Sequence, residues 1–156
     1  MQTFLPLPSV RDTAACLDYK RLGKQRVECK QILQALGVKI GPVGPKGGGW
    51  KNHPATKMWK GHENILLCYA VAICDEWISR GYRDTLREQF MQALQGRLAE
   101  GEFCENGVPE WLGDEDFHKS HRSNLLRKDP DHYGQFGWSE PNDLEYVWPT
   151  EMEGAK

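Results

Sequence analysis

The sequence lacks several features that would place the protein in a large functional class. Its five cysteines are odd in number and form no C-x-x-C pair, which excludes a disulfide scaffold and a zinc ribbon. The glycine-rich stretch at residues 41–49 is not followed by G-K-[ST], so it is not a Walker phosphate-binding loop. The net charge of −2 excludes a uniformly basic nucleic-acid coat. Any site for a polyanion must therefore be a local patch.

Long apolar runs are also missing. No stretch approaches the length that a membrane-spanning helix needs, and the N-terminus has no apolar signal segment. The cysteine pattern indicates reduced thiols. We therefore expect a monomeric cytoplasmic protein that is associated with the nucleoid when it is bound to DNA. We expect no membrane partner and no cofactor.

The length of 156 residues predicts one domain spanning 1–156. Helical periodicity predominates, so we expect a mainly α, compact single-domain helical fold with long loops and an aromatic C-terminal tail. Residues 1–8 are expected to form an N-terminal arm, and residues 139–156 a C-terminal extension.

The segment from Asp18 to Gly37 is the clearest helix. Asp18 can accept a hydrogen bond from an amide of the first turn, and Gly37 suits the left-handed position after the last turn. Leucine, isoleucine and cysteine side chains recur on one face, which predicts that this side packs inward. Further helices are expected over 10–17, 54–80 with a bend at Gly61, 85–99 with a Thr85/Glu88 capping box, and 115–128 after Asp114.

The first half of the 18–37 helix carries a cluster of cations: Lys20, Arg21, Lys24 and Arg26. Such a flank can contact a polyanion, or it can be the solvated face of an ordinary amphipathic helix. Among like charges Lys24 would have a lowered pKa and could form an imine. The alternative role for Lys24 is a phosphate contact.

Two other places carry polar candidates. Lys51, Asn52 and His53 precede Pro54, which suits the first position of a helix, so they could bind an anion there or form a capping turn. In the 115–128 helix, His121 and Asn124 share the inward face, which indicates a wet site. His118 and His121 have the spacing of a metal pair but no third ligand nearby, so no metal site is expected.

The tail contains aromatic residues beside basic ones. Tyr133 and Trp138 could stack on bases, next to the cations Arg122, Arg127 and Lys128, or they could simply cover the core.

Four segments together resemble the pyrimidine-dimer DNA glycosylases, the phage-type UV endonuclease V family. They are GWKNHP at 49–54, KRLGKQRV at 20–27, CDEWISRGY at 74–82 and, more loosely, FHKSHRSNLLRKDPDHYGQFGW at 117–138. The sequence is more similar still to a bacterial and phage branch of that family, through RLGKQRVE, WKNHPA, SHRSNLLRKDP and YVWP.

The resemblance implies a helical domain that binds and bends duplex DNA. In that family the N-terminal α-amine attacks C1′ of a damaged nucleotide, displaces the base and forms an imine, and β-elimination then nicks the strand. A glutamate on the first long helix assists, flanked by arginines.

This chain departs from the family at that glutamate. Leu22 aligns with it, while Arg21 matches the preceding arginine and Gln25 or Arg26 could stand for the second one. Glu28 is the next acid, but it lies about 120° around the helix from Leu22.

The residue after the initiator methionine also differs from the family's pattern. Gln2 replaces the small or hydroxyl residue of the family, so the nucleophilic amine would be that of Met1.

These observations predict a DNA glycosylase, with or without AP-lyase activity, that extrudes a damaged or modified base from double-stranded DNA. The alternatives are a non-catalytic DNA-binding module and a hydrolase of nucleotides or RNA ends. The catalytic candidates are Met1, Lys24, His121 and Glu28. The candidate DNA contacts are Arg21, Gln25, Arg26, Lys51, Asn52, His53, Arg122, Asn124, Arg127, Lys128, Tyr133 and Trp138.

Overall fold

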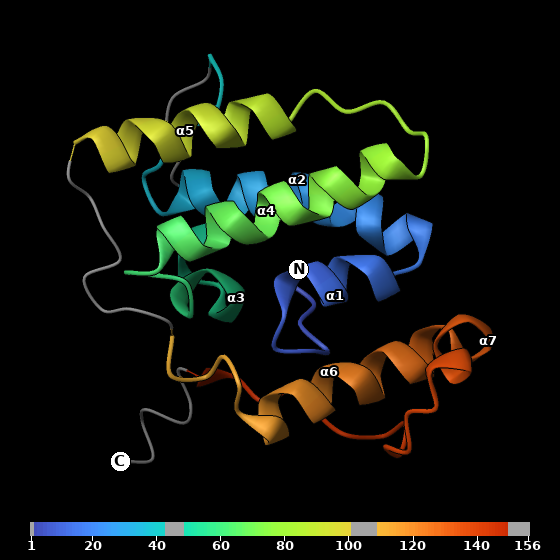
Figure 1. Cartoon of the computed structure of the whole chain (residues 1–156). Coiled ribbons are helices and arrows are strands. Elements are labelled where there is room, and N and C mark those ends of the chain that lie inside the picture. The colour runs from blue at the N-terminus through green and yellow to red at the C-terminus, as the bar shows by residue number, and fades with distance from the viewer. Residues whose placement is uncertain (1, 43–48, 101–108, 150–156) are drawn as a thin grey trace.

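Helices make up the ordered structure of this protein. A computed structural model describes residues 2–42, 49–100 and 109–149, and within these ranges there are helices but no strand, which confirms the mainly α class (Figure 1). The α-helices are α1 (Val10–Cys16), α2 (Tyr19–Ala35), α3 (Pro54–Lys57), α4 (Glu63–Ser79), α5 (Arg87–Ala99), α6 (Glu115–Lys128) and α7 (Pro130–Tyr133), with short 3-10 turns at Gly49–Asn52 and Gly134–Phe136.

Local sequence signals determine where α2 begins and ends. The Asp18 carboxylate accepts from the Arg21 amide, and Gly37 follows the helix with φ of 91°, so both predicted ends are confirmed. Leu22, Ile32 and Leu33 are completely buried. One face of α2 thus packs inward, as its periodicity predicts, and leaves the basic flank on the other side.

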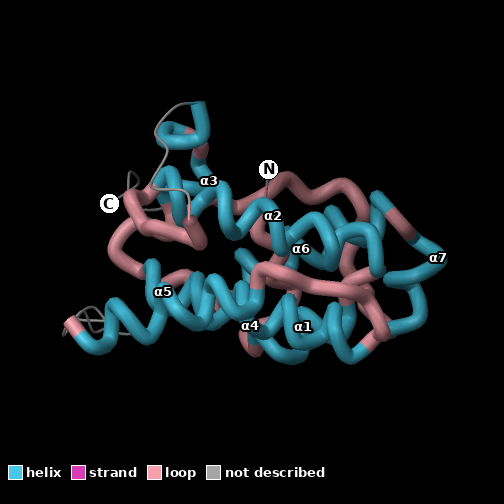
Figure 2. The backbone as a smooth tube through the Cα atoms, turned by 90° about the horizontal axis from the view of Figure 1, so that it is seen from above, coloured by secondary structure: helices cyan, strands magenta, loops and turns pink. Residues whose placement is uncertain are grey.

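The helices are arranged in layers around α4, whose sequence is apolar nearly all round. Helix α4 packs against α2, α5 and α1, while α6 lies on the far side of the N-terminal arm (Figure 1). Figure 2 shows the helices and the loops that connect them from above. Trp59, Tyr69, Phe90 and Phe117 are the large side chains that fill the core.

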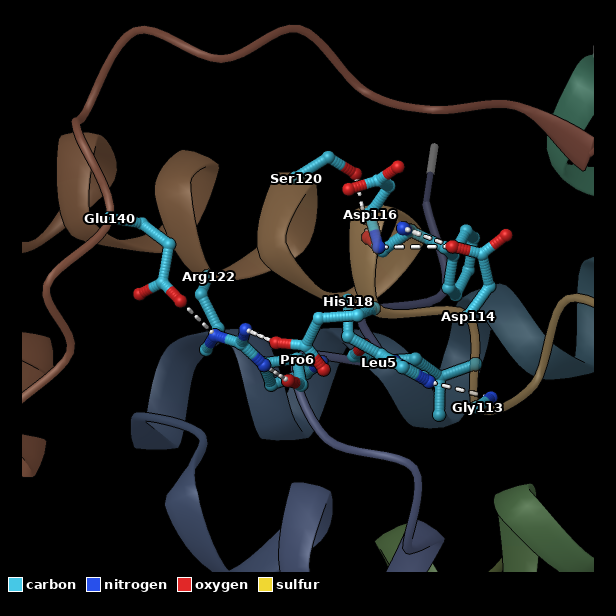
Figure 3. A network of polar contacts seen from close by, with 11 residues as sticks. Leu5, Pro6, Gly113, Asp114, Asp116, His118, Ser120, Arg122 and Glu140 are labelled. Atoms are coloured by element: carbon cyan, nitrogen blue, oxygen red, sulfur yellow. Dashed lines mark hydrogen bonds and ion pairs between the residues drawn. The ribbon is translucent and has the colours of Figure 1, made fainter.

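The N-terminal arm is held between α6 and the α2 layer by its backbone. The Leu5 amide donates to His121 Nδ1 at 2.9 Å, and His118 Nδ1 donates to the Leu5 carbonyl at 2.7 Å. The Arg122 guanidinium donates to the Pro6 carbonyl at 2.8 Å (Figure 3). The arm is therefore an integral, buried part of the fold.

The described part of the C-terminal extension returns along α6. The Leu144 amide donates to Ser123 Oγ at 3.0 Å, Asn124 Nδ2 donates to the Leu144 carbonyl at 3.0 Å, and the Val147 amide donates to Ser120 Oγ at 3.2 Å. These bonds fix residues 144–147 against α6.

Two predicted helices differ in the structure. The 54–80 segment is divided into α3 and α4, because Gly61 takes φ of 86° and a left-handed residue interrupts a helix. Helix α5 begins at Arg87 after Leu86, which makes no side-chain cap bond, so the predicted Thr85/Glu88 capping box is not formed. Asp84 Oδ2 accepts from the Arg87 amide at 2.7 Å. Leu98 is 44% exposed in the last turn of α5.

No helix in the described ranges is both long enough and apolar enough to cross a bilayer. The expected loop at residues 100–109 and the glycine-rich connector at 41–49 lie largely outside the described residues.

Candidate functional site

A hollow of about 390 Å³ opens where the arm, α2 and the C-terminal tail meet. The arm contributes Gln2 and Phe4 to its lining. Helix α2 contributes Lys20, Lys24 and Glu28, which are spaced four residues apart and so share one face of the helix. The hollow thus gathers a carboxylate and several cations around the start of the chain.

Glu28 is the buried acid of this hollow. Its side chain is 9% exposed, and Oε2 accepts from the Gln2 amide at 3.3 Å and from Gln25 Nε2 at 3.1 Å. Lys24 Nζ lies 3.6 Å from Oε1. Leu22, the position at which the resemblance led us to expect a glutamate, is completely buried in the core. The chain therefore places a carboxylate beside its arm from a position six residues further along α2.

Gln25 connects the arm to α2. Its Oε1 accepts from the Phe4 amide at 3.2 Å and from the Tyr69 hydroxyl at 2.9 Å, and its Nε2 donates to the Gln2 carbonyl at 2.7 Å as well as to Glu28. All four of its hydrogen-bonding positions are engaged. The structure thus places this predicted DNA contact in a role that positions the arm.

Cations form the rim of the hollow. Lys20, Arg21 and Lys24 come from α2 and Lys128 from the end of α6. The Lys24 side chain is 74% exposed, so it can reach a ligand in the hollow. A rim of this kind suits a phosphate backbone.

Arg21 is oriented by a buried network. Its Nη1 lies 3.1 Å from Asp18 Oδ1, and the Tyr133 hydroxyl donates to the same carboxylate. Burial raises the pKa of Asp18, but the hydrogen bonds from Tyr133 and Arg21 outweigh it and leave that pKa below its ordinary value. Tyr133 is completely buried, so it supports the rim from behind.

Other predicted contacts are occupied elsewhere. Arg26 pairs with Asp84 at 2.6 Å and lies over the Trp77 ring, 5.0 Å from its centroid. Arg122 pairs with Glu140 at 2.7 Å and also with Glu115 (Figure 3).

The polar and aromatic candidates on α6 and the tail are similarly engaged. Asn124 is 1% exposed and bonded to the Ser120 carbonyl at 2.7 Å, and Arg127 donates to its Oδ1. Trp138 stacks on the buried Tyr133. These contacts engage the side chains of Asn124, Tyr133 and Trp138 within the fold, while Arg127 stays exposed.

The two α6 histidines lie behind the hollow. His121 is completely buried, and its ring centroid lies 6.4 Å from that of Phe4 and 5.4 Å from that of Tyr146. Burial lowers the pKa of His121 to about 3. The inward direction of His121 is confirmed, but its surroundings are aromatic. His118 uses its second nitrogen to accept from the Gly113 amide at 2.9 Å, and no metal-binding group of three occurs in the described ranges.

In the described part of the chain, Lys51, Asn52 and His53 do not line the hollow. His53 caps α3 through Nδ1, which accepts from the Ala55 amide at 3.0 Å, and its ring centroid lies 6.1 Å from that of Trp148. Burial lowers the pKa of His53, and the charge of Glu28 opposes this shift. Lys51 and Asn52 are exposed.

Sequence reasoning did not assign Gln2, Phe4, Lys20 or Tyr146 to the site. The YVWP segment that contains Tyr146 was a mark of the resemblance, but nothing local indicated its place in the hollow. Met1 lies outside the described residues.

Comparison with known proteins assigns the chain to a family. A family model described as pyrimidine dimer DNA glycosylase matches residues 1–89, which is more than half of the chain. The chain belongs to this family. Searches of curated proteins and of solved structures gave no significant match. The matched part supplies the arm and all the α2 residues of the hollow, while Lys128 and Tyr146 lie beyond it. At the level of its family the protein is a DNA glycosylase, and its partner is DNA.

Proposed function

We propose that the protein cleaves the glycosidic bond of a damaged pyrimidine in duplex DNA with an amine nucleophile, and nicks the resulting site by β-elimination. The Met1 α-amine is the proposed nucleophile and Glu28 the group that carries its protons. The observation that supports this assignment is the 3.3 Å contact between the Gln2 amide and Glu28. It ties the residue next to Met1 to a buried carboxylate within a cationic hollow.

The chemistry balances with these groups alone. The neutral amine attacks C1′, and the C1′–N1 bond breaks with its electron pair leaving on the base. One amine proton passes through Glu28 to the base. A second passes to O4′ as the sugar opens and the C1′=N imine forms. Glu28, again a carboxylate, then takes a proton from C2′, and the electron pair of the C2′–H bond forms the C2′=C3′ double bond and expels the 3′ phosphate. An amine whose pKa lies near ~7.7–8.0 is well suited to the first step at neutral pH.

Lys24 is the second candidate nucleophile. It lines the hollow and pairs with Glu28 at 3.6 Å. A phosphate contact is the role that its high exposure favours.

Borohydride trapping tests the proposal. The protein is incubated with duplexes containing a thymine dimer, uracil, 5-hydroxymethyluracil or an abasic site, and the adduct is mapped by mass spectrometry. We expect an adduct at Met1. An adduct at Lys24 would replace Met1 as the nucleophile. Duplex binding with no adduct on any of these substrates would favour the non-catalytic module instead.

Glu28→Gln tests the proton carrier. This change keeps the shape of the side chain but removes its capacity to take a proton, so trapping and nicking should fall at least ~100-fold while duplex affinity stays within about threefold. Glu88→Gln, on the exposed side of α5, is the matched control. Full trapping by the Glu28 variant would remove Glu28 from the mechanism.

A further inference from the structure

Gln2 holds an unused hydrogen-bond donor at the edge of the hollow. The residue is only 5% exposed. Its Oε1 accepts from the Thr3 amide at 2.9 Å, which settles the orientation of the carboxamide and identifies the other atom as Nε2. In the described part of the chain, Nε2 has no hydrogen-bond partner. A buried amide donor without an acceptor is costly, so this group is a candidate for binding a ligand.

The backbone of Gln2 is fixed at the proposed reaction centre. Its amide donates to Glu28 at 3.3 Å, and its carbonyl accepts from Gln25 Nε2 at 2.7 Å. Gln2 therefore adjoins the carboxylate with its main chain and is one of the residues that line the same hollow.

The rest of the lining favours a flat ring with acceptor atoms. The aromatic rings of Phe4 and Tyr146 supply apolar walls, and the bonds of residues 144 and 147 to α6 hold Tyr146 there. The acid in the hollow, Glu28, is already engaged by three donors. A pyrimidine can supply the acceptor that Gln2 Nε2 lacks, because its O2 is a carbonyl oxygen next to the glycosidic nitrogen.

We propose that the Gln2 carboxamide donates a hydrogen bond to O2 of the departing pyrimidine. This inference rests on the proposed function. When the C1′–N1 bond breaks, its electron pair spreads over N1, C2 and O2, and a donor at O2 stabilises that charge before the base takes up a proton. A positioned donor aimed at developing charge typically contributes a factor of ~10²–10³ in rate. Gln2 thereby acts on the leaving group while the amine acts on the sugar.

An abasic site provides the discriminating substrate, because it has no base to expel. We compare single-turnover nicking of a thymine-dimer duplex with nicking of an abasic duplex by wild type, Gln2→Met and the surface control Gln92→Met. Methionine keeps the length of the side chain but has no donor. The ratio of dimer nicking to abasic nicking should fall at least ~30-fold in Gln2→Met and stay at the wild-type value in Gln92→Met. Gln2→Glu, which places an acceptor in the same space, should lower the ratio further.

The outcomes separate this inference from the function on which it rests. Abasic nicking by each Gln2 variant shows that it is folded and assembled. A ratio unchanged by Gln2→Met, or equal losses on both substrates, would overturn the leaving-group role and leave the glycosylase intact. If wild type neither nicks nor is trapped on either duplex, the proposed function fails and this inference fails with it.

Discussion

Individual residues of this protein owe their roles to partners far away in sequence. Arg26 shows this most clearly, because its position on the basic flank of α2 predicts a DNA contact. Its guanidinium instead pairs with Asp84, 58 positions away, and the two side chains are only 14% and 1% exposed. Removing one partner of such a pair leaves a buried charge without compensation.

We therefore expect Arg26→Ala to destabilise the fold by about 3 kcal/mol, measured by urea unfolding. Arg87→Ala removes the exposed pair with Asp75 and should leave the urea midpoint close to that of wild type, because solvent screens an exposed ion pair. If Arg26→Ala instead keeps its stability and loses duplex affinity, Arg26 is a DNA contact after all.

Local residue patterns were sufficient for other features. Asp18 and Asp114 precede α2 and α6 as predicted helix caps, because a cap depends on amides within three residues of it. Glu28, in contrast, meets Gln2 across 26 positions. The sequence made Glu28 a catalytic candidate although it lies about 120° around the helix from Leu22, but helical geometry alone does not show where an arm will lie. Asn124 and Tyr133 were assigned to DNA for the same reason, as their partners could not be seen locally.

At the scale of elements, helix α6 holds the arm with two neutral histidines. The Leu5 amide donates to His121 Nδ1, so this nitrogen must stay unprotonated. Burial lowers the pKa of His121 to about 3, and burial lowers the pKa of His118 as well. In the unfolded chain both histidines titrate near their ordinary value of ~6.5.

Acid should therefore weaken the attachment of the arm. As pH falls below ~6.5, these histidines become protonated in the unfolded chain but stay neutral in the folded chain. The free energy of unfolding therefore drops by up to ~1.4 kcal/mol per pH unit for each histidine. The drop due to His121 continues down to pH of about 3.

His121→Asn tests this expectation, because asparagine can still accept a hydrogen bond but does not titrate. Urea midpoints from pH 7 to pH 4 should fall less steeply for this variant than for wild type. His132→Asn, on α7, controls for the loss of a histidine that does not contact the arm. Parallel curves for wild type and His121→Asn would show that His121 does not cause the acid sensitivity.

At the scale of the whole molecule, charge is segregated. The chain has 20 basic and 22 acidic residues, yet the rim of the hollow gathers Lys20, Arg21, Lys24 and Lys128. A protein with a net charge of −2 can thus present a local cationic surface to DNA. Binding should then depend on a few phosphate contacts.

Salt titration measures those contacts. The slope of log K against log salt concentration changes by about 0.9 for each phosphate contact that is lost. We expect Lys24→Gln and Lys128→Gln each to make the slope shallower by about this amount. Lys39→Gln, an exposed site after the end of α2, should leave it unchanged. Slopes equal to the wild-type slope in all three variants would show that the duplex binds elsewhere.

The two hydrogen bonds at Leu5 have a consequence for how the chain can change. They hold main-chain atoms, so they set the register of the arm whatever side chains it carries. A strand-like segment advances about 3.3 Å per residue, and an insertion or deletion between Gln2 and Leu5 would carry Gln2 that far from Glu28. The number of residues between Gln2 and Leu5 is therefore constrained, in addition to the side chains that the arm carries.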